Sequence, residues 1–90
     1  MYEKYIISPH ISWQLLMGNL YIIDERTHDM YILEDTISKQ LWDAIIIKKD
    51  LQEVIRDISK HYQIDEGIVI NDCREWIKEM EKIDLLRKVS

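Results

Sequence analysis

The sequence predicts an α+β domain in which a three-stranded antiparallel sheet is followed by three α-helices. Two changes in hydrophobic spacing carry this prediction. Apolar residues alternate with a period of two over about residues 11–33, and they recur at helical spacing over about residues 35–83. A chain of 90 residues is long enough for one hydrophobic core. We therefore expect residues 1–90 to form a single winged-helix-like domain whose strands come first.

Three short runs predict the strands. In the first run, Ile11, Trp13, Leu15 and Met17 share one face, and polar residues occupy the other. Gly18-Asn19 predicts a tight hairpin turn, because glycine adopts positive φ without steric cost. The second run covers residues 20–24. A polar break over residues 25–28 separates it from the third run, Asp29 to Leu33, and together the three runs predict a meander.

The three helices are predicted by caps and apolar stripes. Asp35 and Thr36 can cap the first helix, since their side-chain oxygens accept backbone N–H groups. Asp50 and Glu53 form a capping box at the start of the second helix. Asp65 opens the third. The third helix's apolar stripe consists of Val69, Cys73, Trp76, Ile77 and Met80.

Charge argues against nucleic acid as a partner. The chain has 12 basic and 17 acidic residues and a net charge of −5. The third helix, which would be the recognition helix of a winged-helix regulator, is strongly acidic and would be repelled by phosphates. No stretch is apolar enough to span a bilayer, and the N-terminus is a poor secretory signal. The single cysteine fits a reducing compartment, so we expect a cytoplasmic protein.

The residues that could support catalysis are scattered. His10, His28 and His61 have no neighbouring cysteine or carboxylate at a metal-ligand spacing. Cys73 lies on the apolar stripe of a helix, where a small core residue is expected rather than a nucleophile. No phosphate loop or dinucleotide fingerprint is present. We therefore expect a non-enzyme without a metal or cofactor.

The third run is a candidate binding edge. The segment from Met30 to Leu33 is uncharged and presents apolar side chains to both faces. Natural sheets usually protect an edge with charge, proline or a covering element, and an unprotected edge can accept an extended peptide as an added strand. Two alternatives remain open on these residues alone: both faces are buried in the core, or the segment from Tyr2 to Ile7 occupies the edge.

The apolar arc of the third helix is wider than docking on two helices requires. Ile70 and Ile77 extend the stripe on one flank, and Trp76 and Ile83 extend it on the other. The surplus either lines a groove beside the third strand or forms a broad core face in a small domain.

The ordered set of motifs resembles the PqqD-like domains known as RiPP recognition elements. These domains bind the leader segments of ribosomally made, post-translationally modified peptides. The similarity extends from about Pro9 to Leu86. One departure is His28-Asp29, at a turn where many relatives carry glycine. The motifs are the runs 20–24 and 27–33, Leu41-Trp42, Tyr62-Gln63-Ile64-Asp65, Asp72-Cys73, Trp76-Ile77, Met80 and Leu85-Leu86.

The resemblance implies where a leader would bind. In these domains the leader adds antiparallel to the third strand and lies in a groove beside the third helix. If the flank of the third helix that bears Ile70 and Ile77 faces this groove, the implied peptide-binding residues are Asp29, Met30, Tyr31, Ile32, Leu33, Ile70, Cys73, Arg74, Ile77 and Glu81. If the opposite flank faces the groove, Asp72, Trp76 and Ile83 line it in place of these helix residues.

The implied function is that of a non-catalytic adaptor. The chain is most similar to the stand-alone leader-binding proteins of lasso-peptide clusters, whose partner is a leader peptidase. The other readings are a PqqD-type chaperone for a radical peptide-modifying enzyme, a winged-helix transcription regulator, and a scaffold module that docks a protein through Trp13 and the open sheet face.

Overall fold

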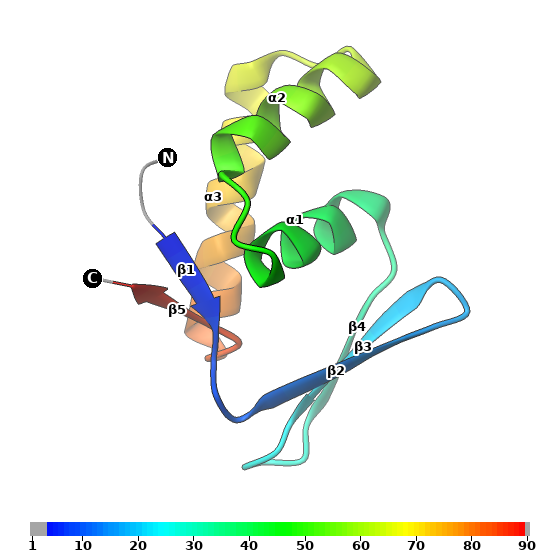
Figure 1. The fold of residues 1–90 in the computed structure, drawn as a ribbon, viewed down its shortest axis with the longest axis vertical. Coiled ribbons are helices and arrows are strands. Elements are labelled where there is room, and N and C mark those ends of the chain that lie inside the picture. Colours follow the sequence, from blue (N-terminus) through cyan, green and yellow to red (C-terminus); the bar gives the residue numbers. More distant parts are fainter. Residues whose placement is uncertain (1–3, 90) are drawn as a thin grey trace.

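The computed structural model describes residues 4–89 and contains the predicted sheet followed by the predicted helices (Figure 1). Two further strands flank this α+β unit. The elements, in order, are β1 (Lys4–Ile7), β2 (Ile11–Leu16), β3 (Asn19–Asp24), β4 (Met30–Leu33), α1 (Thr36–Ile46), α2 (Leu51–Tyr62), α3 (Glu66–Lys82) and β5 (Leu86–Val89).

The three-stranded sheet has the order β2-β3-β4, and both pairs are antiparallel. One face packs on the helices and buries Ile11, Leu20, Ile22 and Leu33. On the same face the ring of Trp13 meets that of Trp42 of α1 edge-on, with centroids 5.8 Å apart. The sheet is therefore docked through a mixed aliphatic and aromatic layer.

The β2–β3 turn corrects the sequence prediction by one residue. Leu16 pairs with Asn19, so the two turn residues are Met17 and Gly18 rather than Gly18 and Asn19. Both have positive φ, 51° and 82°, as a type I′ turn requires. Met17 thus leaves the face assigned to it and its side chain is fully exposed.

α1 and α2 begin at predicted side-chain caps, whereas Asp65 precedes α3 without a side-chain capping hydrogen bond, and none of the three helices ends at a glycine. The carboxylates of Asp35 and Asp50 accept the N–H groups of Ser38 and Gln52, both at 2.9 Å. The helix-terminating positions Lys48, Gln63 and Asp84 all have positive φ, between 54° and 59°. Glycine is the usual residue at such positions because it lacks a Cβ. This conformation sets the directions of the connections that follow α1, α2 and α3.

The N- and C-terminal segments form a ribbon that periodicity did not predict. β1 pairs antiparallel with β5, from Lys4 opposite Val89 to Ile7 opposite Leu86. The ribbon packs beside α1 and α3, at the left in Figure 1, whereas the three-stranded sheet lies below the helices in that view. The described part of the N-terminal segment, Lys4–Ile7, therefore pairs with β5 and not with β4; Tyr2 and Glu3 lie outside the described residues.

A cluster of polar side chains joins this ribbon to the sheet. The carboxylate of Asp84 accepts hydrogen bonds from the Ser8 hydroxyl (3.2 Å) and the Arg87 guanidinium (3.2 and 3.3 Å). His10 Nε2 lies 3.7 Å from Asp24 and 3.5 Å from Asp84. The hydrogen bond from Arg87, more than any other partner, lowers the pKa of Asp84 to about 2.

Candidate functional site

β4 is an edge strand whose outer side is unpaired within residues 4–89. In an antiparallel ladder, alternate residues point their N–H and C=O groups toward the neighbouring strand. Leu16 and Asn19 close a two-residue hairpin, so Tyr21 and Ile23 bond to β2 and the alternate residues of β3 face β4. Consistent with this register, the N–H of Asp24 donates to the carbonyl of Asp29 at 2.9 Å.

The same register fixes which groups of β4 face outward. Tyr31 and Leu33 lie opposite Ile22 and Leu20, and these pairs exchange hydrogen bonds within the sheet. Met30 and Ile32 therefore direct their N–H and C=O groups away from β3. Their side chains are 59% and 45% exposed on the open sheet face. The edge offers backbone donors and acceptors to an added strand, flanked by two apolar side chains.

The turn before β4 is held by a buried carboxylate. Asp24 accepts hydrogen bonds from the backbone N–H groups of Arg26 (2.9 Å) and Thr27 (3.4 Å). Burial by itself raises the pKa of Asp24, but these two hydrogen bonds and nearby positive charge outweigh it and hold the pKa below its usual value. His28 has φ of 65°, so it occupies a conformation that favours glycine. This turn fixes the start of the edge.

A pocket of about 270 Å³ lies just beyond the C-terminal end of β4. Its wall begins at Asp35, two residues after the strand, and continues on α1, around the end of α2 and on α3 from Ile68 to Trp76. Among the described residues, 4–89, the charged ones that line the pocket are Asp35 and Asp72, and both are exposed. The remaining lining residues are Ile37, Ser38, Leu41, Ile58, Ile64, Ile68, Val69, Cys73 and Trp76.

Only some of the α3 residues implied by the resemblance line this pocket. Cys73 lines the pocket and is 2% exposed, and burial raises the pKa of its thiol to about 11. Ile77 is equally buried but lies outside the lining, as do Ile70, Arg74 and Glu81. From the other flank, Asp72 and Trp76 line the pocket and Ile83 does not.

Several lining residues were not anticipated. Ile37, Leu41 and Ile58 have the periodicity of ordinary core residues, so their spacing gave no sign of a pocket. Ile68 differs from these core residues, because its side chain remains 55% exposed on α3. An exposed isoleucine indicates a binding surface, but its exposure is known only once the chain is folded. The pocket arises from three helices converging, and no single helix encodes it.

No group of three or more His, Cys, Asp or Glu residues able to hold a metal ion occurs among residues 4–89. In the same part of the chain, no helix is long and apolar enough to cross a membrane. The three histidines lie in different parts of the fold. His10 lies where the ribbon joins the sheet, His28 lies in the turn before β4, and the ring of His61 packs edge-on against that of Tyr62 at the end of α2.

Two solved structures that share this fold each contain a protein in complex with a leader peptide. TbiB1 in complex with the TbiA(beta) leader peptide matches with a TM-score of 0.82 and 20% identity, over 91% of this chain and 94% of that chain. A lasso peptide synthetase B1 complexed with the leader peptide matches with a TM-score of 0.82 and 13% identity, over 93% and 98%. No family model and no curated protein matches the chain. At these identities the likeness confirms the expected resemblance at the level of the fold.

Proposed function

We propose that this chain binds the leader segment of a ribosomal precursor peptide as an additional strand on β4. The observation that carries the proposal is the outer side of β4, which is unpaired within residues 4–89 and ends at an apolar pocket, in a fold shared with two leader-bound proteins. Backbone hydrogen bonds to Met30 and Ile32 supply affinity that is independent of sequence. Side-chain pockets supply the selectivity.

The direction of the added strand determines which part of the leader reaches the pocket. A leader that runs antiparallel to β4 has its N-terminal part beside Leu33, where the pocket begins. An apolar side chain on the N-terminal side of the paired segment would fill it. The carboxylates of Asp35 and Asp72 favour a basic leader residue next to that anchor, because exposed opposite charges attract.

The proposed site therefore combines the strand residues Asp29, Met30, Tyr31, Ile32 and Leu33 with the pocket side of α3. Cys73, which comes from the first assignment of the helix, lines the pocket together with Asp72 and Trp76 from the second. Beyond Cys73, the pocket favours Asp72 and Trp76 over the flank composed of Ile70, Arg74, Ile77 and Glu81.

In this proposal the chain is a non-catalytic cytoplasmic adaptor, formed by residues 1–90 as one domain. It holds the leader while a leader peptidase or another peptide-modifying enzyme acts on the precursor. Tethering raises the effective concentration of the substrate to as much as roughly millimolar. The three predicted α3 contacts and one added strand make a small interface, in which buried anchors matter more than area.

The direct test is titration of the ¹⁵N-labelled chain with the synthetic TbiA(beta) leader and, where a precursor gene adjoins this chain's gene, with the leader that it encodes. We expect amide shifts at residues 28–34 together with Asp72, Cys73 and Trp76. Shifts at Arg74 and Glu81 instead would support the other flank of α3. Shifts centred on residues 48–60 would contradict the proposed site.

Two controls separate the alternative functions. A duplex DNA that bound with a steep salt dependence, through α3, would favour a winged-helix regulator. A radical peptide-modifying enzyme that acted on its precursor only in the presence of this chain would identify the PqqD-type role, whereas a peptidase with the same requirement would identify the lasso-peptide role.

A further inference from the structure

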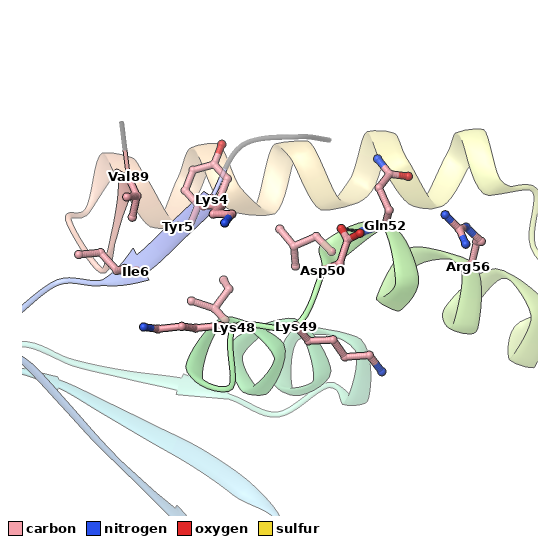
Figure 2. Close-up of a pocket in the computed structure, with 11 residues that line it drawn as sticks. Lys4, Tyr5, Ile6, Lys48, Lys49, Asp50, Gln52, Arg56 and Val89 are labelled. Carbon is pink, nitrogen blue, oxygen red and sulfur yellow. Dashed lines mark hydrogen bonds between the residues drawn. The ribbon is translucent and has the colours of Figure 1, made fainter.

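A second, larger pocket lies away from the proposed leader site. Its volume is about 760 Å³, and it is formed by β1, the end of β5, the α1–α2 connection and the start of α2 (Figure 2). None of its lining residues belongs to β4, to α3 or to the pocket beside β4. A ligand in this pocket and a leader on β4 would therefore contact different residues.

The lining is basic although the protein is acidic. Among residues 4–89, four basic side chains line the pocket, those of Lys4, Lys48, Lys49 and Arg56, against one acidic side chain, that of Asp50. Within residues 4–89, only Lys49 of these four cations has an ion-pair partner, the carboxylate of Asp57 at 3.4 Å. The positive charge is thus concentrated here and largely uncompensated.

The cations are spread along the pocket rather than gathered around one point. Figure 2 shows the Lys48 side chain extending toward the strand end of the pocket and the Arg56 guanidinium at the far end on α2, with Lys49 extending toward that far end. A single phosphate or sulfate could not contact all of them. The exposed side chains of Ile6 and Val89 add apolar surface at the strand end. This arrangement fits an extended chain that carries both carboxylates and aliphatic groups.

Lys48 occupies its position at a conformational cost. It has φ of 59° two residues after the end of α1, where its N–H donates to the carbonyl of Ile45 and the N–H of Lys49 donates to the carbonyl of Ala44. This is the Schellman pattern, in which glycine is the usual residue. A lysine at this position weakens the helix terminus and places an unpaired ammonium on the pocket wall.

We propose that this basic pocket, defined by Lys4, Lys48, Lys49 and Arg56, docks an acidic, aliphatic-containing segment of the enzyme that processes the bound precursor. The inference rests on the proposed adaptor function, which needs one surface for the leader and another for the enzyme. A protein segment fits better than nucleic acid, because a long polyanion would extend from four cations onto a surface that is acidic elsewhere.

The test measures binding of a fluorescein-labelled peptide of three Glu-Glu-Leu repeats by anisotropy at low salt. We expect the K48E/R56E variant to bind about fivefold or more weakly than the wild type, since each exposed pair contributes a fraction of a kcal/mol. The matched control is K78E/K82E, which makes the same charge change on exposed positions of α3 and should change affinity less. Equal weakening by both variants would show a non-specific charge effect and overturn the proposal.

The Lys48→Gly variant separates binding from folding. Because glycine suits the left-handed position, its Tm should be equal to or higher than that of the wild type, while its affinity for the acidic peptide falls. Unchanged affinity would remove Lys48 from the site. Tighter binding of a short DNA duplex than of the peptide, lost in K48E/R56E, would overturn the protein partner in favour of nucleic acid.

Two measurements complete the design. Sedimentation that showed self-association of the wild type, abolished in K48E/R56E, would identify the occupant as a second copy and also overturn the proposal. Leader titration of K48E/R56E should be unchanged from the wild type. If the leader fails to bind both proteins, the adaptor function is wrong; if it binds both while the acidic peptide binds neither, only the basic pocket is wrong.

Discussion

Replacing Ile32 by proline tests strand addition at the level of a single backbone group. The N–H of Ile32 faces outward, so its removal breaks no hydrogen bond within the sheet. Its neighbour Tyr31 is unsuitable for the same test, because the N–H of Tyr31 faces Ile22 and a proline there would break the β3–β4 ladder. Ile32→Pro should therefore fold while losing one donor to the leader.

The expected effect on affinity has two parts. One backbone hydrogen bond contributes about 1 kcal/mol net, and the leader carbonyl left buried without a donor costs a further ~1–3 kcal/mol. The total of about 2–4 kcal/mol corresponds to a Kd increase of roughly 30-fold to 1,000-fold. Isothermal titration calorimetry with the leader measures it, and urea unfolding checks that the free energy of unfolding has changed by less than about 1 kcal/mol.

Leu15→Pro is the matched control on the opposite edge of the same sheet. Leu15 lies on β2, the register directs its N–H away from β3, and its side chain is 64% exposed. This variant should bind the leader with wild-type affinity. Wild-type affinity in a folded Ile32→Pro variant would refute strand addition on β4. Equal weakening in the two variants would show that the loss does not depend on which edge is altered.

Three further outcomes concern stability and reactivity. Met17→Asn should raise the free energy of unfolding by about 1 kcal/mol, since asparagine tolerates the positive φ of a type I′ turn that methionine enters at a cost; an unchanged urea midpoint would contradict the turn geometry. The pKa of Asp84 is lowered to about 2 in the folded chain, so the ionised carboxylate stabilises the fold above pH 3.8 and this stabilisation is lost as the pH falls toward 2. The urea midpoints of the wild type and of Asp84→Asn should therefore differ at neutral pH and converge between pH 3.8 and 2. Burial raises the pKa of Cys73 from 9.0 to about 11, so its thiolate fraction at pH 8 is roughly 100-fold smaller in the folded chain than that of a free thiol. Reaction with a disulfide reagent should be at least that much slower, and rapid labelling of the folded chain would show that the thiol is not buried.

Local sequence determined much of the fold. The change from period two to helical spacing placed three strands and three helices in the right order, because each element must turn one apolar face toward the core. Asp35 and Asp50 were identifiable as caps because capping depends on residues two or three positions away. The candidate edge was visible in the uncharged residues Met30 to Leu33.

Non-local pairing decided what the sequence left open. β1 and β5 lie at opposite ends of the chain and each is only four residues long, so neither has enough periodicity to predict their union. Yet it is this pairing that occupies the described part of the N-terminal segment, Lys4–Ile7, and leaves the outer side of β4 unpaired within residues 4–89. The hairpin register then determined that Met30 and Ile32, and not Tyr31, point their backbone groups outward.

The sequence by itself thus determined the kinds of elements and their apolar faces, because these depend on residues a few positions apart. Only the tertiary structure decided which flank of α3 borders the pocket near β4, where Trp76 and Asp72 meet Ile37 and Ile58 from two other helices. It also gathered Lys4, Lys48 and Arg56, far apart along the chain, into one basic surface. The apolar stripe of a helix can be read from its residue spacing, but packing against neighbouring elements decides which flank of that stripe borders a pocket.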